Sequence, residues 1–189
     1  MAGKLIIFSA PSGAGKTTIV RHLLGIKDLK LEFSISACTR KKRDGEVDNK
    51  DYYFLSVDDF QAKIEDDAFI EWEEVYKNHY YGTLRSEIDR IKTGNSNIIF
   101  DIDVRGGINI KSQFGNDALA IFIMPPSIEE LSNRLGFRGS DSEEKIKRRL
   151  QKAQYELKFS KKFDLIIVNE DLDKALKEAE KAVRDFIFN

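Results

Sequence analysis

The sequence has few of the residues that support disulfide, thiolate or histidine chemistry. Its 189 residues include one cysteine, Cys38, two histidines and three prolines. A single cysteine excludes both a disulfide within the chain and a cluster of thiolate ligands. The sequence also does not open with a charged and then apolar leader of the kind that marks secreted proteins. We therefore expect a protein of the reducing cytoplasm.

A strong charge of one sign and long apolar runs are also missing. The 31 Lys and Arg residues nearly cancel the 32 Asp and Glu residues, leaving a net charge of -1. This balance excludes the global basic excess that is typical of nucleic-acid binding, so any polyanion site must be local. Apolar runs such as LIIF and LIIV are far too short to cross a bilayer. We expect a soluble chain with no nucleic acid and no membrane among its partners.

Short apolar runs rich in isoleucine predict the strands of the fold. Runs at 4–10, 96–103 and 164–170 lack polar alternation, which is typical of strands buried on both faces. A fourth run, at 118–126, ends at its prolines. Apolar residues at helical spacing occupy stretches around these runs, at 17–24, 84–92, 142–159 and 171–187. The alternating order predicts an α/β fold in which helices flank a parallel sheet.

Two stretches interrupt this alternation. Residues 34–83 are dense in aromatic and charged side chains, and we interpret them as an inserted substrate-binding module. Residues 127–150 contain two Ser-x-x-Glu capping boxes, which begin at Ser127 and Ser140. The spacing of these boxes predicts a hinged helical hairpin that carries arginines.

The segment APSGAGKT fits the phosphate-loop pattern with one relaxation, because Ala10 stands where the first glycine is expected. Gly13 and Gly15 would let successive N–H groups wrap closely around a phosphate, in conformations that a Cβ hinders. Lys16 would reach the β- and γ-phosphates, and Thr17 would offer its hydroxyl to Mg²⁺. The alternative is a glycine-rich turn between a strand and a helix with an incidental lysine. The buried strand before the loop and the helix after it favour the phosphate loop.

A magnesium site also needs a carboxylate at the end of a neighbouring strand. The segment NIIFDID supplies Asp101 and Asp103, two residues apart and on one face of an extended segment. Ligands of α/β sheets bind at this carboxyl end of the strands. The alternative for each residue is a helix N-cap or a turn. We assign Asp101 to the metal site together with Thr17.

The inserted stretch contains residues that suit a nucleoside monophosphate. Arg40 and Arg43 flank two lysines, and tyrosines follow closely, which together could clamp a phosphate. Glu71 lies among aromatic residues, and a buried carboxylate can accept both adjacent donors of the guanine edge, whereas adenine offers no such pair. The alternatives are a solvated turn for the basic residues and half-buried strand positions for the tyrosines. GTPase switches read guanine with Asn-Lys-x-Asp, and the VNED segment here argues against that class.

Seven separated motifs together resemble the guanylate kinase family, in the same order and over essentially the whole chain. They are SAPSGAGKT, TRKKRDGEVDNKDYYF, FIEW, YYGT, DIDVRGG, RGSDSEEKIKRRL and DLIIVNED. The resemblance implies transfer of a phosphoryl group from ATP to GMP with Mg²⁺, giving ADP and GDP. It also implies a CORE domain, a GMP-binding domain and a LID. Their boundaries would be 1–33, 84–126 and 151–189 for the CORE, 34–83 for the GMP-binding domain and 127–150 for the LID.

The same resemblance implies a set of site residues. The GMP phosphate would be held by Arg40, Arg43, Tyr52 and Tyr81, and the base addressed by Glu71, Ser36, Thr83 and Asp103, with Glu46 in a supporting polar network. ATP would lie against Ser9, Ala10, Pro11, Ser12, Gly13, Ala14, Gly15, Lys16, Thr17 and Thr18, with Asn169 near the adenine. Catalysis would fall to Lys16 and Arg43 with the lid residues Arg134, Arg138 and Arg149. The segments SACTR and LGFRGS depart from the family pattern, which leaves the set of lid arginines as the least defined part.

Two other functions remain open at this point. One is a noncatalytic guanylate-kinase-like interaction domain that binds a protein partner, which the intact phosphate loop argues against. The other is a kinase for AMP or for a deoxynucleotide, which Glu71 argues against for adenine. The expected partners are the small molecules ATP and GMP, with dGMP as a further candidate acceptor. For the assembly, we expect a monomer or a homodimer.

Overall fold

The computed structural model describes residues 3–136 and 143–189. Its main sheet has five parallel strands in the order β2-β7-β1-β8-β9. Their bounds are β1 Leu5–Ser9, β2 Leu31–Phe33, β7 Asn97–Asp101, β8 Ala118–Met124 and β9 Leu165–Val168. The central strand β1 is buried along its whole length, as its unbroken apolar run predicts.

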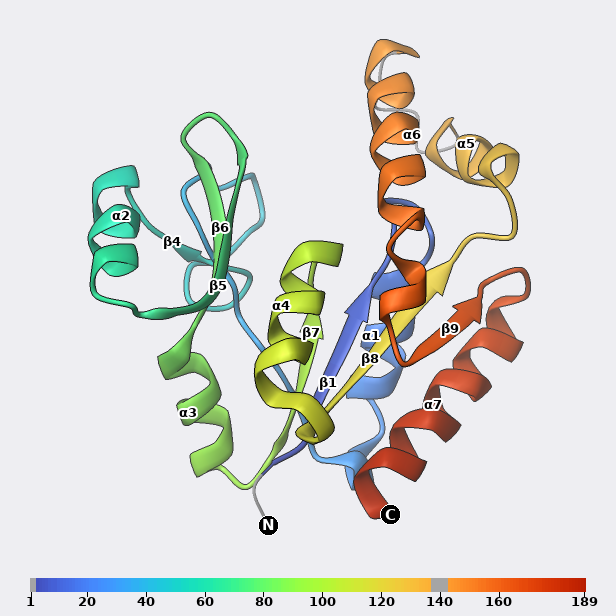
Figure 1. Ribbon diagram of the computed structural model, residues 1–189, viewed down its shortest axis with the longest axis horizontal. Coiled ribbons are helices and arrows are strands. Elements are labelled where there is room, and N and C mark those ends of the chain that lie inside the picture. The colour runs from blue at the N-terminus through green and yellow to red at the C-terminus, as the bar shows by residue number, and fades with distance from the viewer. Residues whose placement is uncertain (1–2, 137–142) are drawn as a thin grey trace.

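Helices cover both faces of this sheet, so the α/β fold with a flanked parallel sheet is confirmed (Figure 1). Ile6 and Phe8 of β1 face a core shared with α1 and α7, whereas Leu5 and Ile7 face a core shared with α3 and α4. The alternation follows from the two-residue period of a strand. The helix bounds are α1 Lys16–Leu24, α3 Arg85–Thr93, α4 Val104–Phe114 and α7 Leu172–Phe188. In the described part of the chain, no helix combines the length and the apolar character needed to span a bilayer.

The inserted residues form a second sheet of four strands in the order β4-β3-β6-β5, together with α2. The bounds are β3 Ala37–Cys38, β4 Tyr53–Phe54, α2 Val57–Glu65, β5 Phe69–Tyr76 and β6 His79–Leu84. This sheet has a small core of its own, in which the ring of Phe60 stacks on those of Phe69 and Tyr80 at centroid distances of 4.3 and 5.4 Å. Cys38 is fully buried beside it.

A helical pair, α5 Ile128–Gly136 and α6 Glu143–Leu157, follows β8. Leu131 and Leu135 of α5 pack against Ala153 of α6. Ser127 caps α5 by accepting a hydrogen bond from the N–H of Glu130 at 3.1 Å, as the first capping box predicts. The second box begins at Ser140, outside the described residues. Figure 1 shows this pair and the second sheet on opposite sides of the carboxyl ends of the main strands.

Candidate active site

The loop between β1 and α1 has the backbone of a phosphate-binding turn. Gly13 and Gly15 have φ angles of 95° and 97°, in the left-handed region where a Cβ is strained. A Cβ added at Gly13 would stand 3.0 Å from Leu135, and one at Gly15 would collide with the side-chain amide of Asn169. Conformation therefore favours glycine at both positions, and at Gly15 the space requires it as well. The helix that starts at Lys16 directs the N–H groups of its first turn toward the loop.

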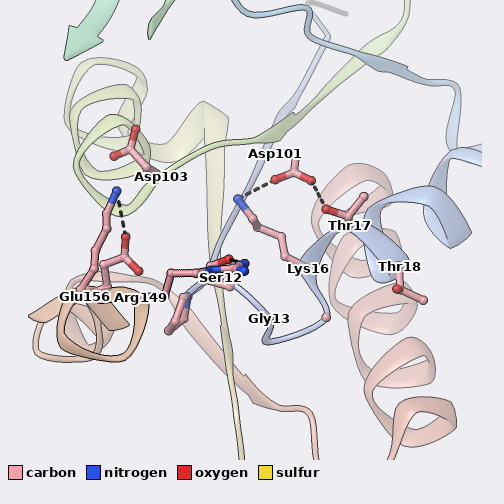
Figure 2. Close-up of a pocket in the computed structure, with 13 residues that line it drawn as sticks. Ser12, Gly13, Lys16, Thr17, Thr18, Asp101, Asp103, Arg149 and Glu156 are labelled. Atoms are coloured by element: carbon pink, nitrogen blue, oxygen red, sulfur yellow. Dashed lines mark hydrogen bonds and ion pairs between the residues drawn. The ribbon is translucent and has the colours of Figure 1, made fainter. Parts of the chain in front are cut away.

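Lys16, Thr17 and Asp101 lie together at the mouth of this loop (Figure 2). Parallel pairing of β1 with β7 sets Phe8 opposite Asp101, so the end of β7 comes beside the loop that follows β1. Nζ of Lys16 lies 2.5 Å from Oδ1 of Asp101 and donates to the carbonyl of Ile102 at 2.8 Å. The hydroxyl of Thr17 donates to Oδ2 of Asp101 at 2.9 Å. The structure thus brings together the three side chains that the sequence predicts for phosphate and metal binding.

A pocket of about 320 Å³ opens over the loop. Its lining residues are Ala10, Pro11, Ser12, Gly13, Gly15, Lys16, Thr17, Thr18, Asp101, Asp103, Arg149, Lys152 and Glu156. Ser9 and Ala14, which the resemblance placed at the ATP site, are fully buried beneath this surface. Asp103 uses Oδ1 to cap α4, where it accepts from the N–H groups of Arg105 and Gly106, and it still lines the pocket. The N-cap alternative considered for Asp103 therefore holds alongside its place at the site.

Two lining residues, Lys152 and Glu156, were missed by the sequence analysis. They lie one helical turn apart on α6, with Nζ of Lys152 3.7 Å from Oε1 of Glu156. Burial raises the pKa of Glu156, and the cations Lys152 and Lys16 oppose this rise. The only sequence signal was that both residues are polar and four apart in a stretch with helical spacing. Such a pair is usual on any solvated helix face, so sequence alone could not distinguish it.

Of the three arginines that the resemblance assigns to a lid, Arg149 and Arg134 lie in different places in the structure. Arg149 reaches the loop and donates to the hydroxyl of Ser12. Arg134 instead donates to Oε1 of Glu130 at 2.9 Å and to the backbone carbonyl of Asn169 at 3.1 Å. Arg138 lies outside the described residues. A role for these arginines in catalysis stays a prediction.

The residues expected to clamp a phosphate lie on β6 and on the loop between β3 and β4. Arg40 makes a paired contact with Glu46, Nη1 to Oε2 at 2.6 Å and Nη2 to Oε1 at 2.5 Å, and its guanidinium lies 4.7 Å from the ring centroid of Tyr52. The Arg40 hydrogen bonds lower the pKa of Glu46 to about 2, helped by the N–H of Arg43. Tyr81 packs edge-on against Tyr52, with centroids 6.2 Å apart. Glu46 therefore acts as a support that orients Arg40.

A second cavity, of about 410 Å³, is lined along α1 by Thr17, Val20, Arg21 and Leu24 and borders Glu46 and Tyr52, which contact Arg40. Its lining also includes Ser36 from the inserted residues and Asp101 at the end of β7. The two cavities therefore share the Thr17–Asp101 pair.

Glu71 is buried on β5, an edge strand of the second sheet, with 6% of its surface exposed. Thr83, on the neighbouring strand β6, donates its hydroxyl to Oε1 of Glu71 at 2.7 Å. Burial raises the pKa of Glu71 to about 7, and the charge of Asp103 adds to the rise while the Thr83 hydrogen bond opposes it. The site thus contains a carboxylate whose charge is poised near neutral pH.

Comparison with known proteins agrees with this geometry. The sequence model of the guanylate kinase family, described as "Guanylate kinase", matches residues 2–186. A guanylate kinase of Porphyromonas gingivalis is 51% identical over 184 residues, covering 97% of this chain and 98% of the relative. A guanylate kinase of Bacteroides thetaiotaomicron is 49% identical over 187 residues, covering 99% of this chain and 91% of the relative.

Solved structures agree as well. The crystal structure of guanylate kinase from Anaplasma phagocytophilum superposes with a TM-score of 0.76 at 26% identity, covering 100% of this chain and 88% of that chain. The phosphate loop, the strand-end carboxylate and the buried Glu71–Thr83 pair thus occur in a chain that matches one family over nearly its whole length. The chain belongs to the guanylate kinase family.

Proposed function

We propose that the protein transfers the γ-phosphoryl group of ATP to GMP, giving ADP and GDP. The observation that carries the proposal is that the cavity over the phosphate loop and the cavity beside the arginine clamp share Thr17 and Asp101. A donor in the first cavity and an acceptor phosphate held beside Glu46 and Tyr52 would both approach Thr17 and Asp101. Phosphoryl transfer needs this arrangement above all, because it depends on two phosphates held in line.

The donor would place its phosphates against the N–H groups of the loop and the start of α1. Lys16, which pairs with Asp101 in the structure, would turn from that carboxylate toward the β- and γ-phosphates. The Lys16 ammonium group would exchange the Asp101 carboxylate for the phosphates of the donor, so it would have an anionic partner both before and after the nucleotide binds. Arg149, which contacts Ser12, would then have the γ-phosphoryl group within reach of its guanidinium.

Thr17 and Asp101 would hold Mg²⁺ between them and the nucleotide. Their oxygens lie 2.9 Å apart and line the pocket, and both are the hard donors that Mg²⁺ prefers. Mg²⁺ commonly binds through one or two protein oxygens, with substrate phosphates and waters completing its coordination, so the pair fits the ion. When bound, the ion neutralises charge on the transferring phosphates.

The acceptor would bind through the second sheet. Arg40, oriented by Glu46, would bind the GMP phosphate together with Tyr52 and Tyr81. Glu71 in its ionised form would accept from both donors of the guanine edge, with Ser36, Thr83 and Asp103 beside it. No general base is needed, because the phosphate oxygen of GMP is already ionised at neutral pH. Closure of the lid and the inserted module would exclude water and bring Arg43 and Arg138 to the reacting phosphates.

A coupled assay that offers ATP with GMP, AMP, CMP or UMP tests the proposal. ADP formation with GMP alone is the expected result. Turnover with AMP in place of GMP would contradict the acceptor assignment, and no turnover with any acceptor would favour the noncatalytic interaction domain. The same assay with dGMP tests the further acceptor. A cytoplasmic location and a monomeric or homodimeric state stay predictions.

A further inference from the structure

Asn169 is held in the structure at the junction of three elements. It directly follows β9, and its backbone N–H donates to the carbonyl of Met124 at the end of β8, at 2.8 Å. Its carbonyl accepts the hydrogen bond from Arg134 of α5. Only 5% of its surface is exposed. Both backbone groups are thus fixed, which leaves the side chain in a defined position.

The side-chain amide of Asn169 is directed at the phosphate loop. Nδ2 donates to the carbonyl of Ala14 at 2.7 Å, and this hydrogen bond is buried. Ala14 lies between the two glycines with left-handed backbone. The collision that a Cβ at Gly15 would suffer shows that the amide packs directly against the loop.

The hydrogen bond sets the direction of one loop N–H. In a planar trans peptide the carbonyl of Ala14 and the N–H of Gly15 point to opposite sides. Holding the carbonyl toward Asn169 therefore directs the N–H of Gly15 away from Asn169. Gly15 lines the pocket over the loop and Asn169 does not, so the N–H is directed toward the space where a phosphate would lie.

We infer that Asn169 is a positioning residue for the phosphate loop, acting through the carbonyl of Ala14 whichever base the donor nucleotide has. The inference rests on the proposed function, because it assigns a role within the same donor site. It differs from the adenine contact that the family resemblance implies for Asn169. A base contact affects only donors with adenine, whereas a loop support affects every triphosphate equally.

Asn169→Ala tests the inference. With GMP as acceptor, we expect kcat/KM to fall about 10- to 100-fold for ATP and by the same factor for inosine triphosphate. The loss of one well-directed hydrogen bond from the N–H of Gly15 to a charged phosphate has about this effect. Binding of inorganic triphosphate, measured by calorimetry as a donor without any base, should weaken as well. Asn169→Asp should lose more than the alanine variant, because it places a carboxylate oxygen against the Ala14 carbonyl.

The controls separate positioning from folding. The exposed neighbour Glu170 is the matched site, and Glu170→Gln should retain wild-type values for all donors. Binding of GMP alone should be unchanged in Asn169→Ala, because the inserted residues would supply that site. The inference would be overturned if Asn169→Ala lowered kcat/KM for ATP only and bound inorganic triphosphate as the wild type does. It would also be overturned if the variant lost GMP binding and triphosphate binding to the same extent. Failure of the wild type to phosphorylate GMP would instead refute the proposed function, and triphosphate binding would still test the loop.

Discussion

Raising the pH from 6 to 8 should tighten GMP binding through the ionisation of Glu71. The carboxylate must be charged to accept both donors of the guanine edge, and burial raises its pKa to about 7. With that pKa, roughly a tenth of the side chain is ionised at pH 6 and roughly nine-tenths at pH 8. The Glu71 contribution to the association constant should therefore rise about tenfold over this interval.

The GMP phosphate titrates in the same range, with a second pKa near 6, so the wild-type profile alone mixes two effects. Glu71→Gln supplies the correction, because its side chain is neutral at every pH while the ligand is the same. Calorimetric titrations of both proteins between pH 6 and 8 give the two profiles, and their ratio isolates Glu71. Equal pH dependence in the two proteins would refute the reasoning.

Thr83 provides an independent check on the same carboxylate. Its hydroxyl lowers the pKa of Glu71 by stabilising the charged form. Thr83→Val keeps the shape of the side chain but removes the donor, so the midpoint of the GMP-binding profile should move to higher pH. A midpoint that stays in place would show that the hydroxyl does not act on the ionisation of Glu71.

GMP binding should tighten as the pH rises, but the free energy of unfolding of the ligand-free protein should fall. The folded-state pKa of about 7 lies above the ordinary value of 4.5, so the folded state binds the proton more tightly than the unfolded state. The free energy of unfolding should therefore fall as the pH rises from about 4.5 to about 7, by roughly 3 kcal/mol for this group, and then level off. Urea unfolding of wild type and Glu71→Gln across this range measures the difference.

Three further predictions concern other parts of the molecule. Lys16→Ala should lower kcat at least about 100-fold and leave GMP affinity unchanged, because the lysine binds only the donor phosphates. Near-normal turnover of this variant in the coupled assay would contradict the phosphate-loop assignment. Tyr53→Phe should lower the free energy of unfolding in urea by about 2 kcal/mol, since its hydroxyl donates to the fully buried carboxylate of Glu87 at 2.8 Å; unchanged stability would show that this bond contributes nothing net. Ile121→Ala should lower the same free energy by about 2 to 5 kcal/mol, because Ile121 is fully buried in the sheet core, and a loss below 1 kcal/mol would contradict that packing.

Local patterns predicted most of the main framework. The apolar run at 4–10 is typical of a strand covered on both faces, and β1 Leu5–Ser9 confirms it; the spacing in 171–187 predicted the helix observed at Leu172–Phe188. The phosphate loop was predictable because its glycines, lysine and threonine are neighbours in the chain. The strand-end position of Asp101 followed from the same logic, since parallel strands end at one edge of the sheet.

Contacts between residues far apart in the chain could not be predicted from local sequence patterns. The family resemblance indicated that Asn169 and the loop belong to one site, but the hydrogen bond from Asn169 to Ala14 joins residues 155 positions apart. Lys152 and Glu156 became pocket residues only because α6 lies over the loop. Chain spacing carries no information on such contacts, because they depend on how finished elements pack together.

The sequence by itself predicted the strands β1, β7, β8 and β9 and the helices α1, α3, α6 and α7, the position of the phosphate loop and the residue types that could bind a nucleotide, because these properties depend on neighbours within a turn or two. It did not predict β2, α4 or the elements of the second sheet. The tertiary structure decided the rest: the pairing of Arg40 with Glu46, the raised pKa of Glu71 and the support of Ala14 by Asn169. Burial and the charges of distant side chains set ionisation and orientation, and both exist only once the chain has folded.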